Sequence, residues 1–383
     1  MDPIDPMARA FELAARALGR TAPNPPVGAV VVRDGAIVGE GHHLAAGRPH
    51  AEAIALAAAG RHARGATLYV SLEPCAHQGR TPPCAEAIIA AGVAEVRYAV
   101  DDPDPRVSGR GASTLEAAGV RVVAGERRTE GSELLRGYLT RQRAGRPWVT
   151  AKYAMSLDGK TATRTGDSRW ISGEASRRYA HALRDRADAI VVGIGTVLAD
   201  DPSLTVRPAP SDGRQPGRVV IDSRLRLPLD AALAGPALAP GTTVAYVEGQ
   251  DPGDPGRVSR AALLRERRLE LLPLPADPSG RVDLPALLSE LGRRGMNEVL
   301  VEGGGELLAG LLEAGLIDEV EACVAPVLVG GAGAPTPIRG QGASSVIDAP
   351  RWQVVNVTRR APDVWLRVRP DRAVEEGDVQ RDR

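Results

Sequence analysis

The sequence predicts an α/β protein built from two domains, and three observations indicate this fold class. At 383 residues the chain is too long for a single ordinary hydrophobic core. Short apolar segments alternate with amphipathic ones, as strands alternate with crossover helices. The segment AGRPWVTA, residues 144–151, separates two such alternating halves. We therefore expect one domain over residues 1–145, a second over 146–369, and a charged, disordered tail over 370–383.

The first half predicts a compact domain of about five strands. Residues 7–18 carry apolar side chains on one helical face, and the hairpin that follows turns at Arg33, Asp34 and Gly35. Helical connections between the later strands indicate that most of these strands are parallel. The expected strands are VGAVVV, AIVGEG, TLYVSL, EVRYAV and VRVVAG, and the later helices are HAEAIALAAAG, CAEAIIAAG, ASTLEAAG and SELLRGYLTRQR.

The second half predicts another α/β unit that does not resemble the first. Its expected strands are WVTAKYAM, AIVVGI, RVVIDS, TTVAYV, EVLVEGG and EVEACVAPVLVG, and the helix GELLAGLLEAG precedes the last of them. Proline and glycine gather between residues 228 and 282, which predicts surface loops there.

Charge and composition limit the possible partners. The 48 basic and 48 acidic side chains cancel, so we expect no general attraction to nucleic acid or anionic lipid. No apolar run is long enough to span a bilayer, and the start MDPIDPMARA lacks the apolar core of a signal peptide. These features predict a cytoplasmic enzyme without nucleic-acid or membrane partners. Its expected partners are small molecules and further copies of itself, as a homo-oligomer.

The chain contains three cysteines, Cys75, Cys84 and Cys323. They are too few and too unevenly placed for a disulfide framework, so they are either reduced thiols or metal ligands. Cys323 lies in an apolar predicted strand and is expected to be a buried thiol without chemistry.

One histidine and two cysteines follow the order of a catalytic zinc site. His50 opens a predicted helix, Cys75 ends a predicted strand, and Cys84 opens the next helix. Such a three-ligand set leaves a fourth position for water, whose pKa zinc lowers, and Glu52 is placed to accept that proton. The competing interpretation makes the cysteines core thiols and His50 a helix cap. His77 is either a substrate contact or a surface imidazole.

The motifs LEPCAHQGRTPPC, PHAE and APNPPVGAVVV resemble the deaminase half of the RibD family, the bifunctional deaminase/reductases of the riboflavin pathway. The zinc-deaminase signature has the form P-C-x-x-C, but here eight residues separate Cys75 from Cys84. The resemblance implies a cytidine-deaminase-like three-layer α/β/α domain, with zinc on His50, Cys75 and Cys84 and with Glu52 as proton carrier. The family's PNPNVG appears as PNPPVG, which retains Asn24 as a pocket contact or as a turn residue.

Two glycine turns in the second half are candidates for phosphate binding. Residues 193–195 and 303–305 each follow a predicted strand, but neither turn matches the dinucleotide fingerprint. The second turn opens a predicted helix, so its backbone N–H groups favour an anion. A purely structural glycine turn would explain the same residues.

The motifs SLDGKTA, SRWIS, LRDRADAIVVGIGTVLADDPSLTVR, RVVIDS and VEGGG resemble the reductase half of the same family, so the resemblance spans about residues 7–369. It implies a dihydrofolate-reductase-like α/β fold. It also implies NADPH contacts at Ala154, Trp170, Thr196, Asp200, Ser223, Gly304 and Gly305. Contacts to a pyrimidine ribosyl phosphate are implied at Ser168, Arg184, Leu204, Arg207 and Glu302.

Several of these residues have a second interpretation. Trp170 either stacks on the nicotinamide or fills the core. Asp200 and Asp201 form either a carboxylate pair at the reaction centre or a cap before a loop. Arg184 and Arg207 suit a phosphate, because a guanidinium pairs two oxygens at once, although a single arginine in this chain is more often a surface charge.

Both lysines of the chain, Lys152 and Lys160, lie in the segment AKYAMSLDGK. Lys152 would enter the cofactor site on a strand, where an ammonium can release a proton and a guanidinium cannot. Lys152 is therefore the candidate acid of the reductase, whereas Lys160 is interpreted as a loop charge beside Asp158.

The sequence thus predicts two consecutive reactions on one small molecule. Zinc-dependent hydrolysis replaces an exocyclic amine on a diaminopyrimidinone that bears a ribosylamino phosphate, and NADPH then reduces the ribosyl group to a ribityl chain. One alternative is a zinc nucleobase deaminase that acts on RNA. Another makes the second half a non-catalytic, nucleotide-binding regulatory module.

Overall fold

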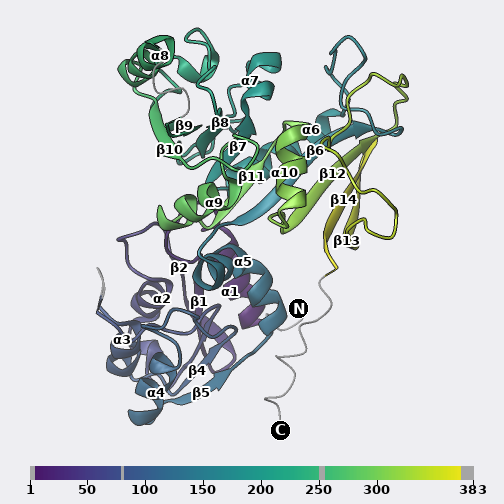
Figure 1. Cartoon of the computed structure of the whole chain (residues 1–383). Helices are drawn as coiled ribbons and strands as arrows, with labels where there is room; N and C mark the ends of the chain where they lie inside the picture. The colour runs from purple at the N-terminus through teal and green to yellow at the C-terminus, as the bar shows by residue number, and fades with distance from the viewer. Residues whose placement is uncertain (1–4, 79–81, 250–254, 372–383) are drawn as a thin grey trace. The chain divides into compact units, whose positions relative to one another are not determined.

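The computed structural model describes residues 5–78, 82–249 and 255–371. It divides into two compact units (Figure 1), one formed by Met1–Trp148 with Ser289–Glu298 and the other by Val149–Leu288 with Val299–Arg383. The expected limits of the domains stay predictions, because compactness alone does not show which segments fold independently. Among the described residues, no helix combines the length and the apolar character that a bilayer span requires.

A five-stranded sheet in the order β2-β1-β3-β4-β5 forms the centre of the first unit. Strand β1 is antiparallel to both β2 and β3, whereas β3, β4 and β5 run parallel. The predicted hairpin, the five strands and the parallel direction of the later strands are therefore confirmed. The strands are β1 (Gly28–Arg33), β2 (Ala36–His42), β3 (Thr67–Val70), β4 (Glu95–Tyr98) and β5 (Arg121–Ala124).

Helices cover both faces of this sheet (Figure 1). Gly28 and Gly41 lie on opposite faces, because Gly41 pairs with the neighbour of Gly28 in the antiparallel ladder. A Cβ on Gly28 would lie 2.0 Å from the Ala10 carbonyl oxygen in α1, and one on Gly41 would lie 2.5 Å from the Ala51 carbonyl oxygen in α2. The two helices thus press against opposite faces and form three layers. The helices are α1 (Pro6–Ala15), α2 (Ala51–Ala59), α3 (Cys84–Ala91), α4 (Arg110–Ala117) and α5 (Arg128–Ala144).

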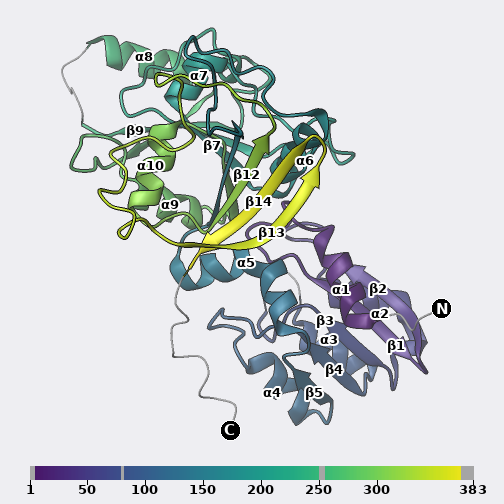
Figure 2. The same ribbon diagram turned by 90° about the vertical axis from the view of Figure 1, so that its right-hand side faces the viewer.

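The second unit contains a nine-stranded sheet in the order β10-β9-β8-β7-β11-β6-β12-β14-β13. Neighbours from β10 to β11 are parallel, as are β6 and β12, whereas β14 and β13 are added antiparallel as a hairpin at one edge (Figure 2). The strands are β6 (Trp148–Ser156), β7 (Ala189–Gly193), β8 (Gly217–Ile221), β9 (Thr242–Val247), β10 (Glu270–Leu274), β11 (Glu298–Val301), β12 (Glu319–Ala325), β13 (Trp352–Arg360) and β14 (Asp363–Pro370). Its helices are α6 (Glu174–Arg186), α7 (Ile194–Asp200), α8 (Pro255–Glu266) and α10 (Gly305–Glu313), and α9 (Leu284–Arg293) begins in this unit and ends in the first.

The interval 228–282 differs from the surface loops that were expected. It contains α8 and β10 besides the predicted strand β9, and Leu272 and Leu274 of β10 are buried. Pro273 lies between these two leucines, and a proline is tolerated here because β10 is an edge strand. The expected tail begins inside β14, whose last residue is Pro370, and residues 372–383 lie outside the described part of the chain.

The parallel strands bring several loops to one edge of the second sheet. Strands β7, β8 and β11 end at this edge, and they are followed by residues 194–195, 222–226 and 302–305. The carboxyl ends of neighbouring parallel strands form the usual ligand-binding edge of an open α/β sheet. Strand register therefore gathers residues that are far apart in the chain.

Candidate active sites

Three metal-binding side chains converge in the first unit. His50 caps the N-terminus of α2, Cys84 begins α3, and Cys75 lies in the loop after β3. The His50 Nδ1 atom is 3.2 Å from the Cys84 Sγ atom and 3.6 Å from the Cys75 Sγ atom, and the three donor atoms lie within 4.8 Å of one another. Tetrahedral zinc holds nitrogen and sulfur donors roughly 3.5–3.8 Å apart, so this set fits the metal. Core thiols with an unrelated helix cap would not converge in this way.

The two thiols of this group differ in their affinity for a proton. Hydrogen bonds from the Cys84 thiol and then from His50 lower the pKa of Cys75 to about 4, although burial opposes the shift. The same contact with the Cys75 thiolate raises the pKa of Cys84. The Cys84 backbone N–H also donates to the Cys75 sulfur at 3.4 Å. Cys75 is therefore a thiolate at neutral pH, the form that binds a cation.

Glu52 lies beside these donors in the first turn of α2 and is only 4% exposed. Burial raises the pKa of its carboxyl, and the negative charge of Cys75 raises it further. The His50 charge and a hydrogen bond with Cys84 act in the opposite direction. This carboxyl holds a proton more readily than an exposed glutamate does, which is the property of a proton carrier.

His43, which the sequence did not single out, supports the predicted ligand His50. It is 2% exposed and packs edge to face on the His50 ring, with ring centroids 5.3 Å apart. The Nδ1 atom donates to the Pro49 carbonyl at 3.1 Å, since a carbonyl oxygen only accepts, and this leaves Nε2 to accept from the Asn24 amide at 2.9 Å. The Asn24 side chain thus contacts His43, and no spacing in the sequence marks this pair.

His77 lies in the loop that carries Cys75 and is partly buried. Its Nδ1 atom is buried and has no hydrogen-bond partner within residues 5–78, 82–249 and 255–371. Buried polar atoms are normally hydrogen-bonded, so this atom indicates a position where a ligand can bind.

Two further buried acids hold the loop after β4. Glu73 is 3% exposed and accepts three hydrogen bonds, at 3.1–3.3 Å, from backbone N–H groups within residues 102–112. Asp102 accepts a hydrogen bond from the Tyr138 hydroxyl at 2.8 Å. Burial raises the pKa of Asp102 to about 6. These contacts fix the chain next to the loop of Cys75.

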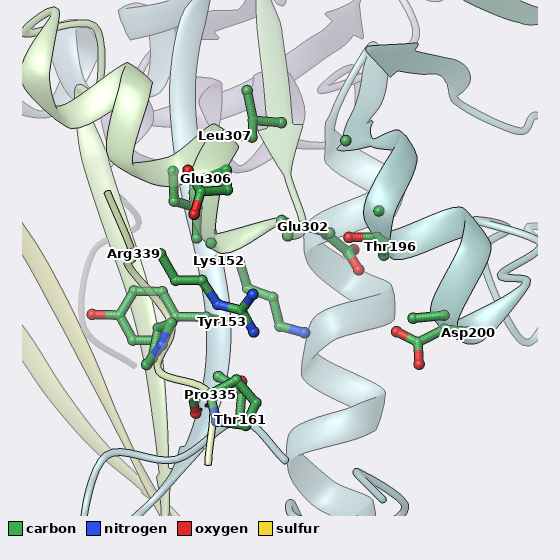
Figure 3. A pocket seen from close by; sticks show the side chains of 18 of the residues that line it. Lys152, Tyr153, Thr161, Thr196, Asp200, Glu302, Glu306, Leu307, Pro335 and Arg339 are labelled. Carbon is green, nitrogen blue, oxygen red and sulfur yellow. Dashed lines mark hydrogen bonds between the residues drawn. The ribbon is translucent and has the colours of Figure 1, made fainter. Parts of the chain in front are cut away.

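A cavity of about 1370 Å³ opens in the second unit at the carboxyl ends of β7, β8 and β11 (Figure 3). Lys152 from β6 and Arg339 from the segment between β12 and β13 are among the cations that extend into it (Figure 3). All but one of the residues predicted for the reductase line the cavity. They are Lys152, Ala154, Ser168, Trp170, Arg184, Thr196, Asp200, Arg207, Ser223, Glu302, Gly304 and Gly305.

Arg184 on α6 is paired with a buried carboxylate, and its predicted contact with the substrate stays a prediction. Its Nε and Nη2 atoms donate to the two Glu302 carboxylate oxygens at 2.6 and 2.7 Å, and its Nη1 atom donates to the Thr205 carbonyl at 2.8 Å. Burial raises the pKa of Glu302, but Arg184 and then Lys152 lower it more, so the carboxylate stays charged. A buried carboxylate requires such a paired cation, and the Glu302 side chain is 6% exposed.

Arg207 remains the candidate for the substrate phosphate. Its side chain is exposed at the cavity, and its backbone N–H donates to the His181 Nδ1 atom at 3.1 Å. Burial, and then the charges of Arg184 and Arg207, lower the pKa of His181, which favours the neutral ring that accepts this hydrogen bond. His181 precedes Arg184 by one turn of α6 and was missed because an isolated histidine on a helix carries no motif.

The structure decides between several open interpretations. Trp170 is 71% exposed, so it does not fill the core. Leu204 is 2% exposed within an apolar cluster and does not line the cavity, so a ligand can reach it only through its main chain. Asp201 accepts a hydrogen bond at 2.8 Å from the backbone N–H at the start of the 3₁₀ turn 232–234 and caps that turn, whereas Asp200 lines the cavity. Cys323 is fully buried in β12, as expected.

The glycine turn between β11 and α10 requires glycine for two different reasons. The angle φ is +132° at Gly303 and +91° at Gly304, a region that other residues rarely adopt. At Gly305 the reason is steric, because a Cβ atom on this residue would lie only 2.6 Å from the Cγ atom of Arg339. The turn lines the cavity at the start of a helix, where backbone N–H groups favour an anion.

Both units match known families. Residues 4–100 match the cytidine and deoxycytidylate deaminase zinc-binding region, and residues 147–366 match the RibD C-terminal domain. The chain is 44% identical to the riboflavin biosynthesis protein RibD of Bacillus amyloliquefaciens, an alignment that covers 98% of this chain and 99% of the relative.

Two solved structures extend this similarity to the whole fold. RibD of Acinetobacter baumannii, form 1, has 39% identity and a TM-score of 0.83, with 95% of this chain and 98% of that chain covered. A protein from Thermotoga maritima, described as a diaminohydroxyphosphoribosylaminopyrimidine deaminase/5-amino-6-(5-phosphoribosylamino)uracil reductase, has 35% identity and a TM-score of 0.81, with 95% and 97% covered.

The folds and the two sites define a bifunctional enzyme, in which a zinc-type deaminase is joined to a reductase. The chain belongs to the RibD family of riboflavin biosynthesis proteins. The expected cytidine-deaminase-like unit and dihydrofolate-reductase-like unit are confirmed. The first unit implies zinc, and the second implies a nicotinamide cofactor.

Replacing Arg184 with methionine should destabilise the second unit strongly. Arg184→Met leaves the Glu302 carboxylate buried without its cation, a loss of about 3–5 kcal/mol. Arg207→Met removes an exposed arginine from the same cavity and should cost less than about 0.5 kcal/mol. Urea denaturation of both variants measures the difference, and similar costs would show that the Glu302 charge does not depend on Arg184.

Asp102 should make the chain less stable as the pH rises from about 4 to about 6. Folding raises the pKa of Asp102 from the usual 3.8 to about 6, so between these two pH values the folded chain keeps a proton that the unfolded chain has released. The stability that this proton provides is lost as the pH rises to about 6. The shift of about two units corresponds to roughly 3 kcal/mol. Asp102→Asn should remove this part of the pH dependence in the free energy of unfolding, measured for both metal-free chains. Identical pH profiles would contradict the assignment.

Proposed function

We propose that the chain acts on one pyrimidine ribosyl phosphate in two consecutive steps. The first removes an exocyclic amine from a diaminopyrimidinone that bears a ribosylamino phosphate, and the second reduces the ribosyl group to a ribityl chain with NADPH. The convergence of His50, Cys75 and Cys84 beside the buried Glu52 carries this proposal, together with the reductase cavity in the same chain. The activities named for the Thermotoga maritima relative support the same order.

In the deaminase unit, His50, Cys75 and Cys84 would hold zinc, which lowers the pKa of a water molecule. Glu52 accepts a proton from the water and passes it to the departing amine. The water oxygen bonds to the ring carbon, the carbon–nitrogen bond breaks, and ammonia leaves. The raised pKa of Glu52 supports both proton transfers. His77 Nδ1, which lacks a partner among the described residues, is positioned to contact the substrate.

In the reductase unit, the residues that line the cavity would hold NADPH, which when bound would supply a hydride to the ribose carbon that bears the amine. The carbon–oxygen bond of the sugar ring opens, and the released oxygen takes a proton from the Lys152 ammonium. Lys152 suits this role because it extends into the cavity (Figure 3) and lies near enough to Glu302 to lower the pKa of that carboxyl. The exposed Arg207 binds the substrate phosphate.

Cofactor contacts are proposed along the same cavity. The exposed indole of Trp170 can stack on the nicotinamide, and the glycine turn before α10 offers backbone N–H groups to the pyrophosphate. The remaining proposed contacts of NADPH are Ala154, Thr196, Asp200 and Ser223. The substrate is proposed to contact Asn24 in the deaminase unit. In the reductase unit it is proposed to contact Ser168, the main chain of Leu204 and the Arg184–Glu302 pair.

A cytoplasmic homo-oligomer is also proposed. Strand β13 is an edge strand and exposes Val354, Val355 and Val357, at 62%, 48% and 60%. An exposed apolar edge favours pairing with another copy of the chain. Sedimentation velocity of the full chain should give the mass of two or more copies, and a single-copy mass at micromolar concentration would refute this part.

A coupled assay tests the two activities separately. The diamino substrate is supplied with and without zinc and NADPH, and ammonia and NADPH absorbance are followed independently. Glu52→Gln should lower ammonia release by about 10²–10⁴-fold, because the proton carrier is lost, yet keep NADPH oxidation on the deaminated intermediate. Lys152→Arg should do the reverse, because a guanidinium does not release its proton. Lys160→Arg is the matched control, since Lys160 does not line the cavity.

An unimpaired reductase in Lys152→Arg would contradict the role of Lys152. Full ammonia release by Glu52→Gln would contradict the role of Glu52. Binding of NADPH without its oxidation, in the presence of the deaminated intermediate, would contradict the second activity and favour a regulatory module.

A further inference from the structure

The first unit includes a segment from far along the chain, Ser289–Glu298, which the predicted first domain did not contain. The end of α9 packs directly on the end of α5, because a Cβ on Gly292 would lie 2.3 Å from the Gly145 carbonyl oxygen. A Cβ on Gly295 would lie 2.7 Å from the Pro23 Cβ atom. Glycine at both positions therefore lets this segment lie against α5 and against the loop that precedes β1.

Asn297 of this segment is buried and links two other parts of the first unit. Its Oδ1 atom accepts a hydrogen bond from the Arg141 Nε atom at 2.7 Å, and its Nδ2 atom donates to the Asn24 carbonyl at 3.2 Å. Arg141 also donates from Nη2 to the Pro23 carbonyl at 2.6 Å. Two adjacent carbonyls of the loop before β1 are therefore held by a connected pair of side chains, and such a network makes the loop rigid.

The Asn24 side chain extends this set of contacts to the metal-binding group. Its Nδ2 atom donates to the His43 Nε2 atom at 2.9 Å, and the His43 ring packs edge to face on the ring of His50. The carbonyl that Asn297 binds and the amide that reaches His43 belong to the same residue. A shift of the Asn24 main chain would therefore move the side chain that contacts His43 and, in the proposed function, the substrate.

Other contacts attach the same segment to the first unit. The Asn297 carbonyl accepts a hydrogen bond from the Trp148 N–H at 2.8 Å. The Glu298 Cγ atom would lie 2.4 Å from a Cβ on Gly137 of α5, and a Glu298 carboxylate oxygen lies 3.5 Å from the Arg136 Nη2 atom. These contacts do not use the Asn297 side chain, so that side chain is available for the separate task of holding Asn24.

We propose that Asn297 is a positioning residue of the deaminase site, although it precedes β11 in the reductase half of the sequence. By binding the Asn24 carbonyl, it fixes the Asn24 amide against His43 and toward the substrate. The inference rests on the proposed deaminase function and adds to that site a residue from the other half of the chain.

The substitution Asn297→Asp tests this role with little change of shape. The aspartate still accepts from Arg141, but it presents an oxygen in place of the N–H group to the Asn24 carbonyl, and two acceptors repel each other. In the full chain with zinc, the deaminase KM for the diamino substrate should rise about 10-fold, the effect of one lost buried hydrogen bond. The deaminase kcat should change by less than about threefold, because the zinc ligands and Glu52 keep their contacts.

Glu298→Gln is the matched control, because it removes a charge from the same segment and keeps the contact with Asn24. It should leave the deaminase KM within about twofold of the parent value. NADPH oxidation on the deaminated intermediate should also stay within about twofold in both variants, since neither residue lines the reductase cavity.

Hydrogen exchange of the metal-free chain gives a readout that requires no turnover. The Asn24 N–H donates to the Thr21 carbonyl at 2.8 Å, so its exchange reports how well this loop is held. In Asn297→Asp it should exchange about 10-fold faster than in the parent, because the loop loses one of its buried hydrogen bonds. Exchange of the β3 amides should not change, which separates a local effect from general unfolding.

An unchanged deaminase KM in Asn297→Asp, beside a parent chain that releases ammonia, overturns the inference and leaves the proposed function intact. An equal rise of KM in Glu298→Gln, a parallel loss of both activities in Asn297→Asp, or unchanged exchange at Asn24 also overturns it. A parent chain that releases no ammonia overturns the proposed deaminase function and the inference with it.

Discussion

The ion pair between Arg184 and Glu302 is the contact on which the second site depends. A carboxylate at this depth is too costly to keep charged without a cation beside it. The pair joins α6 to the end of β11, and the Arg184 hydrogen bond to Thr205 extends the connection to the segment that carries Arg207. Three parts of the chain that are distant in sequence thus receive fixed positions around one cavity.

The first unit buries a carboxylate for the opposite purpose. Glu302 stays charged because a guanidinium holds both of its oxygens, so its task is to maintain a position. Glu52 instead has its pKa raised by burial and by the neighbouring thiolate, so it can gain and lose a proton. One chain therefore contains one buried glutamate whose surroundings keep it charged and a second whose surroundings suit the proposed proton carrier.

Local signals in the sequence were sufficient for much of this arrangement. The turn at Asp34 and Gly35 predicted the hairpin, and the placement of His50, Cys75 and Cys84 at element ends predicted a metal site. The missed features depend on contacts between distant segments. The support of His50 by His43 and Asn24, and the pairing of Arg184 with Glu302, have no spacing that a single sequence reveals. Strand β10 was missed because the proline and glycine content of residues 228–282 indicated loops, although an edge strand tolerates a proline such as Pro273.

The glycine at position 305 shows how one residue can depend on another far along the chain. Its backbone does not require glycine, unlike that of Gly303 and Gly304, and the space for a methyl group is taken by Arg339. Alanine at 305 is therefore unfavourable while a side chain with a Cγ atom, such as Arg339, occupies this position. Homologues with a small residue at 339 should tolerate larger residues at 305, so these two positions should vary together across the family.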